Sequence, residues 1–173
     1  SHVKNAPEEI FDVVDEQDRV IGQAPRGMIH RDGLLHRAVH IFAFNPSGEL
    51  FLQRRALGKD SAPGLWSSSC SGHVDAHETY EQAAIRELGE EIGLVLGLPE
   101  LVLRLKVTPC RETENEFVQL FYCRSSTPLQ LDPIEVMDGR WISKLKLEAW
   151  VDREPEAFAP SFLHLFAMDR LIH

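Results

Sequence analysis

Three glutamates stand close together near the middle of the chain, in the stretch from Gly72 to Leu94. Glu87, Glu90 and Glu91 are spaced by three and then one residue, which on an α-helix places them on one arc of about 100°. Carboxylates this close repel one another and raise each other's pKa values. A divalent cation with oxygen ligands removes that repulsion, and Mg²⁺ or Mn²⁺ suits such ligands. The stretch therefore predicts a helix that holds a metal ion.

The same stretch contains signals for both ends of a helix. Glu78 or Thr79 can cap the first turn, and Gly93 suits the left-handed position that commonly follows a last turn. The acidic residues lie toward the C-terminal end of this helix, where the helix dipole disfavours negative charge. Helix stability does not explain that placement, whereas a metal site does.

The stretch resembles the Nudix box. The positions that carry the resemblance are Gly72, Glu78, Arg86, Glu87, Leu88, Glu90, Glu91, Gly93 and Leu94. The resemblance implies an α/β fold of the Nudix type, an α/β/α sandwich with a mixed β-sheet. It also implies a hydrolase in which water attacks a phosphoanhydride bond of a nucleoside-diphosphate-linked or related substrate, with Mg²⁺ or Mn²⁺ as cofactor.

The Nudix resemblance also implies roles for individual residues. Glu87, Glu90 and Glu91 are the implied metal ligands, and the Gly72 carbonyl is a further one. Arg86 is implied to orient the glutamates by pairing with Glu78. The base that takes the proton of the attacking water is either Glu90 or Glu116, an acid outside the box.

The charge of the chain restricts its partners. The formal net charge is −9, so a nucleic-acid polymer or an anionic membrane would be repelled. A small diphosphate substrate needs a local basic patch, and Arg54 and Arg55 offer one. Neighbouring strand residues point to opposite faces, so only one of the two arginines can face a given cleft. The alternative is that both belong to a solvated strand end.

The chain is expected to form a single domain over residues 1–173. Residues 1–9 are expected to be a disordered tail that begins with a tag remnant, residues 10–35 a hairpin and a turn, and residues 36–173 the Nudix core. Three cysteines without metal-finger spacing fit a cytoplasmic protein. We expect no transmembrane helix, because no apolar run is long enough. A monomer and a homodimer both remain open.

A second resemblance, to the isopentenyl diphosphate isomerase branch of the Nudix superfamily, covers roughly residues 11–141. It is carried by Leu35-His36-Arg37-Ala38, the run from Leu52 to Ala56, Pro63-Gly64-Leu65-Trp66, Gly72-His73 and Glu114-Asn115-Glu116. In that branch three histidines and two glutamates hold a metal. The matching residues here are His36, His73, Glu114 and Glu116, with His30 one residue out of register. They imply a second site for Mn²⁺, Zn²⁺ or Mg²⁺, and the alternative is a solvated surface turn.

The sequence departs from the isomerase pattern at the residue that donates the proton in that branch. The isomerase requires a cysteine directly before its Gly-His pair, and Ser71 stands there instead. Cys70 lies one residue earlier, and a one-residue shift on a strand turns a side chain to the opposite face. The isomerase branch also has a degenerate box, whereas this box keeps each glutamate. We therefore expect a Nudix hydrolase; the alternatives are isopentenyl diphosphate isomerase-like activity and a catalytically silent nucleotide-binding module.

Overall fold

The computed structural model describes residues 8–172, so residues 1–7 of the expected tail lie outside the described residues. The strands are β1 (Ile10–Val14), β2 (Val20–Pro25), β3 (His36–Phe44), β4 (Leu50–Arg55), β5 (Trp66–Ser67), β6 (Cys70–His73), β7 (Val102–Val107), β8 (Glu116–Arg124) and β9 (Val136–Ile142). The helices are α1 (Arg26–Asp32), α2 (Tyr80–Ile92), α3 (Lys144–Arg153) and α4 (Pro160–Leu171). Within the described residues, no helix is both long and apolar enough to cross a bilayer.

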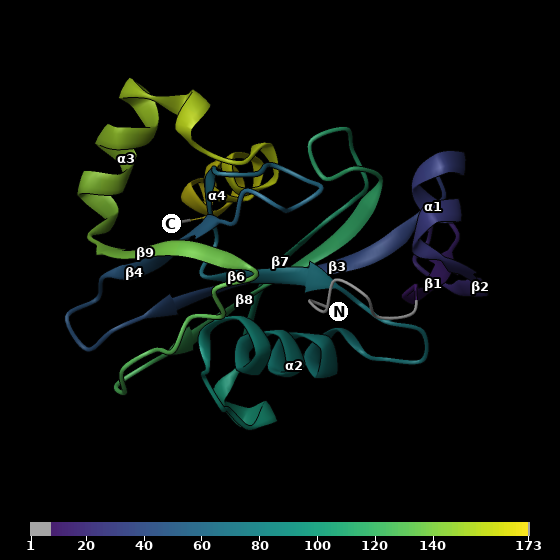
Figure 1. Ribbon diagram of the computed structural model, residues 1–173, viewed down its shortest axis with the longest axis horizontal. Coiled ribbons are helices and arrows are strands. Elements are labelled where there is room, and N and C mark those ends of the chain that lie inside the picture. Colours follow the sequence, from purple (N-terminus) through teal and green to yellow (C-terminus); the bar gives the residue numbers. More distant parts are fainter. Residues whose placement is uncertain (1–7, 173) are drawn as a thin grey trace.

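A seven-stranded mixed sheet forms the middle layer, with α2 on one face and α3 and α4 on the other (Figure 1). β3 pairs in parallel with β8, and the other strand pairs of this sheet are antiparallel. This arrangement is the predicted sandwich.

The central strand β3 is buried on both faces, because its side chains alternate between two cores. Val39, Ile41 and Ala43 pack with the apolar side of α2. Phe42 points to the opposite face and packs with α4. His40 belongs to the same face as Phe42, which is also the face that carries the functional cavity.

Helix α2 begins and ends where its local signals predict. Thr79 is the N-cap, and its hydroxyl accepts a hydrogen bond from Gln82 N while the Gln82 side chain accepts one from Thr79 N. Gly93 follows the helix with a φ of 68°, a left-handed conformation that glycine adopts at low cost. The cap therefore falls on Thr79, one of the two residues considered.

The helical spacing of apolar residues runs from Pro155 to Leu171 and predicts one final helix, but the helix starts only at Pro160. Residues Pro155–Ala157 form a 3₁₀ turn, and α4 starts at Pro160. Between them the chain is extended, because Phe158 pairs with Trp66 of β5 and Ala159 N donates to Trp66 O. Pairing with the sheet edge thus overrides the helical spacing of the sequence.

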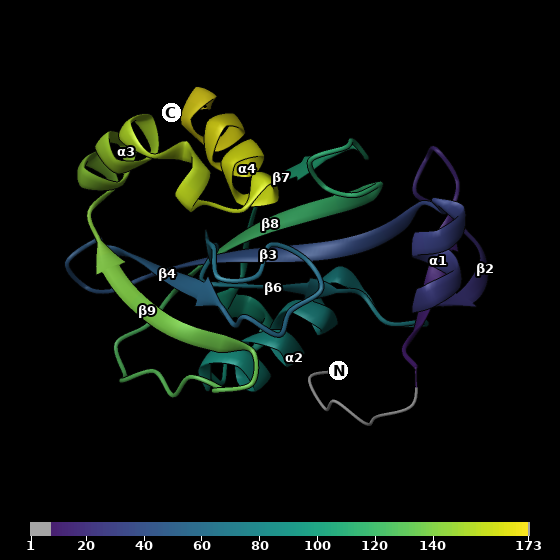
Figure 2. The ribbon, with the colours of Figure 1, turned by 45° about the horizontal axis from the view of Figure 1, so that its top comes forward.

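Strands β1 and β2 form an antiparallel hairpin that continues into α1. Figure 2 shows this unit at one end of the main sheet. Asp18, in the turn of the hairpin, fastens it to the sheet and to α2. The Asp18 carboxylate accepts hydrogen bonds from Arg37 Nε at 2.6 Å and from the Tyr80 hydroxyl at 2.7 Å, and Lys106 Nζ also contacts it. The anchor matters for function because α1 contributes to the cavity wall.

We expect Asp18→Ala to lower the free energy of unfolding by about 1.5–3 kcal/mol, because it leaves the partly buried Arg37 and the exposed Lys106 without their shared anion. Burial would raise the pKa of Asp18, but hydrogen bonds from Lys106, Arg37 and Tyr80 outweigh it and lower the pKa below 3.8. The carboxylate therefore stabilises the fold above pH 3.8, and this contribution is lost as the pH falls through the lower pKa of the folded state.

Urea unfolding at pH 7 and at pH 3 measures both effects. Glu16→Ala, an exposed change in the same turn, is the matched control and should shift stability by less than about 0.5 kcal/mol. Equal stability of the two variants would show that Asp18 is not the anchor.

Candidate functional site

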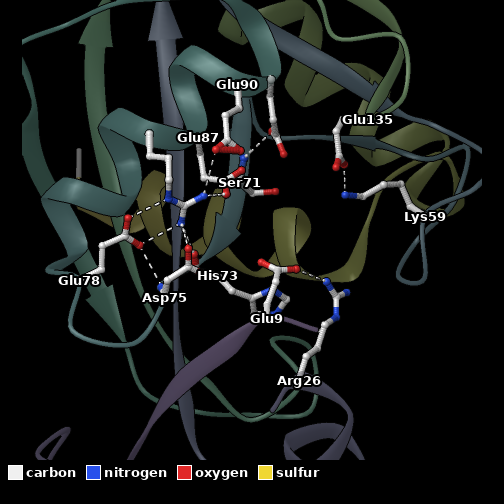
Figure 3. A network of polar contacts seen from close by, with 12 residues as sticks. Glu9, Arg26, Lys59, Ser71, His73, Asp75, Glu78, Glu87, Glu90 and Glu135 are labelled. Atoms are coloured by element: carbon white, nitrogen blue, oxygen red, sulfur yellow. Dashed lines mark hydrogen bonds and ion pairs between the residues drawn. The ribbon is translucent and has the colours of Figure 1, made fainter. Parts of the chain in front are cut away.

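A cavity of about 900 Å³ opens on the face of the sheet opposite the core of α2. Its wall combines residues from α1, β3, β4, β6 and α2 with the two loops after β4 and β7. The charged and imidazole side chains on it are Glu9, Arg26, His30, His40, Arg55, Lys59, Asp60, His73, Glu87, Glu90, Glu91, Arg111, Glu112, Glu114, Glu116 and Glu135. Figure 3 shows part of this polar network, with Glu87 and Glu90 on one side and His73 and Glu9 on another. Such a wall suits a metal ion together with a charged substrate.

Strand register brings together a trio of metal-ligating side chains, His36, His73 and Glu116. His36 on β3 lies directly opposite Glu116 on β8. His73 on β6 lies opposite Ala38, two residues along β3 and therefore on the same face as His36. Residues far apart in the sequence thus meet at one end of the cavity.

The trio offers ligand atoms close enough together to hold a metal ion. The Nε2 atoms of His36 and His73 lie 3.1 and 2.8 Å from the same oxygen, Glu116 Oε2. The Nδ1 atom of His36 lies 2.9 Å from the Leu34 carbonyl, which only accepts, so Nδ1 carries the hydrogen. The other ring nitrogen, His36 Nε2, faces the Glu116 carboxylate. Either a second proton on Nε2 or a metal ion would then lie between the two groups. One carboxylate and two imidazoles fit Mn²⁺, Zn²⁺ or Mg²⁺.

Attraction between the Glu116 carboxylate and the imidazoles outweighs burial in setting the pKa values of Glu116 and His36. Burial would raise the pKa of Glu116, but the charge of His73 and the hydrogen bonds from both imidazoles lower it to about 2. Burial would lower the pKa of His36, but the hydrogen bond and the charge of Glu116 raise it above 6.5. Glu116 is therefore an anion that binds a cation, whether a proton on imidazole or a metal.

His30 also belongs to this end of the cavity, although it is one residue out of register with the isomerase pattern. Its ring centre lies 5.8 Å from those of both His36 and His73. Burial, followed by the charge of His73, lowers its pKa below 6.5, so the ring stays neutral at pH 7. A neutral imidazole is the form that binds a metal.

The three glutamates of α2 line the cavity from the helix side. Glu87 and Glu91 are buried, and Glu90 is half-buried. Glu91 Oε1 accepts hydrogen bonds from Gln53 Nε2 at 2.9 Å and from Ser71 N at 3.3 Å. Burial, and then the charge of Glu91, raises the pKa of Glu87 well above its ordinary value. This buried acidic pair therefore favours a bound cation or a retained proton.

Arg86 holds the glutamate cluster in place. Its Nε and Nη2 atoms donate to the two oxygens of Glu78 at 2.8 and 2.9 Å, and Nη2 also donates to the His73 carbonyl at 3.1 Å. Its Nη1 contacts Glu87 and lies 3.7 Å from Glu90. Gly72 packs so closely on Glu87 that a Cβ at position 72 would overlap the carboxyl group. The box residues thus form one packed unit.

The two adjacent arginines point in different directions, as the alternation of a strand requires. Arg55 lines the cavity, whereas Arg54 is absent from its wall. Each donates its Nε to a backbone carbonyl of the following loop at 2.8 Å, Arg55 to Ser61 and Arg54 to Gly64. Of the two, Arg55 is the one whose side chain reaches the cavity.

Neighbouring residues of β6 also divide between the two faces of the sheet. Cys70 lies opposite Ile41, is fully buried and packs in the core under α2. Ser71 lies opposite His40 and lines the cavity. Burial, followed by the charge of Glu91, raises the pKa of the Cys70 thiol well above its ordinary value. The thiol is therefore directed away from the cavity.

Glu114 stands apart from the trio. Glu114 and Glu116 would point to one face only if residues 114–116 were extended, and the segment turns instead. Glu114 and Asn115 have left-handed φ values of 56° and 66°, so the chain turns sharply before β8. Glu114 lines the cavity and accepts a hydrogen bond from Ser61 Oγ at 3.3 Å.

Several residues of the cavity wall do not belong to any of the sequence motifs described above. They are Glu9, Arg26, His40, Lys59 and Glu135. Glu9 pairs with Arg26 across 3.2 Å, and Lys59 contacts Glu135, which lies in the loop before β9 (Figure 3). His40 follows His36 at strand spacing, a signal that could have placed both on one face.

The protein-family comparison matches residues 34–163 to the NUDIX domain. The chain therefore belongs to the Nudix family. The solved structure of DR0079 from Deinococcus radiodurans is 28% identical and superposes with a TM-score of 0.74 over 94% of this chain and 98% of that one. The fold class expected from the box is confirmed.

Curated relatives indicate the branch of the Nudix family to which the chain belongs. "Isopentenyl-diphosphate Delta-isomerase 2" of Photorhabdus laumondii is 37% identical over 157 residues, 90% of this chain and 89% of the relative. "Isopentenyl-diphosphate Delta-isomerase" of Burkholderia multivorans is 40% identical over 158 residues, with the same coverage. These relatives place the chain in the isopentenyl-diphosphate-isomerase-like subgroup of the family.

These relatives also correct the expected activity. The prediction of a hydrolase, or pyrophosphatase, is wrong, because relatives that match nine-tenths of the chain are isomerases. The prediction relied on the intact glutamates of the box. Carboxylates that hold a metal ion against a diphosphate would serve an isomerase of a diphosphate as well as a hydrolase, so the box does not identify the bond that changes.

Proposed function

We propose that this chain is a divalent-metal-dependent isomerase that moves the double bond of isopentenyl diphosphate. The observation that carries the proposal is the trio of His36, His73 and Glu116 at one end of the cavity. The isomerase resemblance implied a metal site from these residues, and strand pairing draws them together. Relatives named as this isomerase, at 37% and 40% identity, support the substrate.

The proposed cofactor is Mg²⁺ or Mn²⁺. His36, His73 and Glu116 would hold one ion, with His30 close by. Glu87, Glu90 and Glu91, with the Gly72 carbonyl, would hold an ion against the substrate, and Arg86 would orient them. When bound, such an ion supplies positive charge that neutralises a diphosphate and positions it.

Moving a double bond by one carbon requires a proton to be added at one carbon and another to be removed nearby. We assign the base to Glu116, whose Oε2 contacts both imidazoles and whose Oε1 would take the proton. The Ser71 hydroxyl is too weak an acid for the other step, and the Cys70 thiol faces away from the cavity. We assign the acid to a carboxyl group that the box contributes to the cavity wall, Glu90 or Glu91.

The diphosphate end of the substrate would bind to basic side chains of the cavity wall. Arg55 and Lys59 line it on one side, and Arg26 lines it from α1. Lys59 contacts Glu135 and Arg26 contacts Glu9, so both cations are already held near the opening. An arginine can bind phosphate oxygens through two parallel hydrogen bonds.

We expect Arg55→Ala to raise the KM for isopentenyl diphosphate by about tenfold or more, because a charge-assisted hydrogen bond contributes about 1.5–3 kcal/mol. Arg54→Ala removes the same side chain and an equivalent bond to a loop carbonyl, but outside the cavity. It should change KM by less than about threefold. Steady-state kinetics measure both, and equal effects would place the phosphate elsewhere.

The proposal is tested by incubating the purified protein with isopentenyl diphosphate and Mn²⁺ or Mg²⁺, and following isomer and phosphate separately. The expected result is formation of the allylic isomer, loss of that activity after treatment with a chelator, and recovery when metal is returned. Release of phosphate or pyrophosphate without isomer would contradict the proposal. Binding of the diphosphate without any reaction would contradict it as well.

A further inference from the structure

A second cluster of metal-ligating side chains lies outside the residues assigned to the reaction. Cys110, Glu112 and His164 each offer a ligand atom, and the three atoms lie within 4.8 Å of one another. Cys110 and Glu112 belong to the loop between β7 and β8, and His164 lies on α4. The cluster thus joins a loop of the cavity wall to a helix of the outer layer.

The loop holds Cys110 in a defined position. Thr113, which is 1% exposed, accepts a hydrogen bond from Cys110 N at 3.2 Å and donates one to Glu116 O at 3.1 Å. Asn115 N also donates to Cys110 O at 3.0 Å. His164 lies on α4 beside Leu165, which is buried in the core, so the backbone at His164 is fixed by packing. Ligands fixed in this way bind an ion with little loss of conformational freedom.

The spacing of the two stronger ligands fits zinc. Cys110 Sγ lies 3.8 Å from His164 Nε2. Tetrahedral zinc with Zn–S near 2.3 Å and Zn–N near 2.05 Å places these two atoms about 3.6 Å apart. These two atoms reach that spacing after a shift of a few tenths of an ångström, and the carboxylate of the exposed Glu112 lies within 4.8 Å of both. A thiolate, an imidazole and a carboxylate are the ligand types that zinc prefers.

We propose that Cys110, Glu112 and His164 form a zinc site, with water as the fourth ligand. The ion would fasten the loop between β7 and β8 to α4. That loop carries Glu114 and leads directly into Glu116, so a fastened loop would also hold one wall of the cavity. The site uses none of the residues assigned to the isomerase reaction and is independent of that proposal.

Cobalt(II) tests the site because it replaces zinc and reports its ligands by absorption. The whole chain, freed of metal and kept reduced with a phosphine, is titrated with Co²⁺ alone. We expect a near-ultraviolet thiolate-to-cobalt band that one equivalent of Zn²⁺ removes. The trio of His36, His73 and Glu116 contains no sulfur, so cobalt bound there produces no such band.

Three variants identify the ligands. Cys110→Ser should abolish the band, and His164→Gln should weaken cobalt binding by more than about tenfold, as expected for loss of a ligand. Cys123→Ala, which removes a thiol buried in the core, should keep the band. Far-ultraviolet circular dichroism and thermal melting of the metal-free variants check that each one folds.

Absence of the band in the wild-type chain would overturn the proposal. So would a band that persists in Cys110→Ser, a band lost in folded Cys123→Ala, or unchanged cobalt affinity in folded His164→Gln. In any of these cases the contact between Cys110 and His164 would be an ordinary hydrogen bond. Zinc should also raise the melting temperature of the wild type more than that of Cys110→Ser, which keeps the other metal-binding residues.

Discussion

Glu116→Gln is expected to lower the rate of isomerisation by about 10²–10⁴-fold, the range associated with loss of a general base. The change keeps the size of the side chain and removes the charge that both imidazoles contact at 3.1 and 2.8 Å. The same variant should bind Mn²⁺ more weakly, because an amide is a poorer ligand than a carboxylate. Product formation and metal content measure the two effects on one sample.

A second consequence of Glu116→Gln separates this role from general damage to the fold. The hydrogen bond and charge of Glu116 raise the pKa of His36 above 6.5, so the pKa of His36 should fall in the variant. Nuclear magnetic resonance of the imidazole follows this titration without any substrate. A folded variant with wild-type isomerisation would remove Glu116 from the mechanism.

Phe162→Ala is expected to lower the free energy of unfolding by about 3–5 kcal/mol, the usual cost of truncating a buried phenylalanine. Phe162 is fully buried on the sheet-facing side of α4. Its ring centre lies 5.7 Å from that of Phe158, 5.4 Å from that of Phe166 and 5.9 Å from that of Phe42 on β3. Truncation would leave a cavity between the outer layer and the sheet.

Met168→Ala on the same helix is the matched control for Phe162→Ala, because Met168 is 41% exposed. It should cost less than about 1 kcal/mol, in line with surface substitutions. Urea unfolding of the two variants and the wild type supplies the comparison. A loss below about 1 kcal/mol for Phe162→Ala would mean that α4 is not packed through this ring.

Local signals explain why the box helix could be predicted closely. Thr79 and Gly93 are each read from neighbouring residues, and both act at the ends of α2 as caps. The burial of β3 on both faces likewise follows from its own run of apolar residues. These features depend on contacts within a few residues, which pattern and propensity describe well.

Features that depend on strand pairing could not be predicted in the same way. His36 and Glu116 are 80 residues apart, and only the parallel register of β3 and β8 sets them opposite each other. The turn at Glu114 removed it from the face that an extended segment would have shared. Lys59 and Glu135 meet because two loops lie side by side, and no spacing in the sequence encodes that.

The wrong prediction of hydrolysis has a chemical origin. The glutamates of the box describe how a metal and a diphosphate are held, and this requirement is common to cleavage and to isomerisation. The position of Ser71 was correctly read as a departure from the isomerase pattern, and Cys70 does face the core. That departure changes which group serves as the acid in the proposed reaction.

The central claim is that the cavity transfers protons to and from carbon, and deuterium incorporation tests it most directly. Isopentenyl diphosphate is incubated with the Mn²⁺- or Mg²⁺-loaded protein in D₂O and followed by nuclear magnetic resonance. We predict the allylic isomer with deuterium in its newly formed methyl group, because the added proton comes from a group that exchanges with solvent. A double bond that stays in its original position, with no deuterium on carbon and with or without released phosphate, would contradict the account.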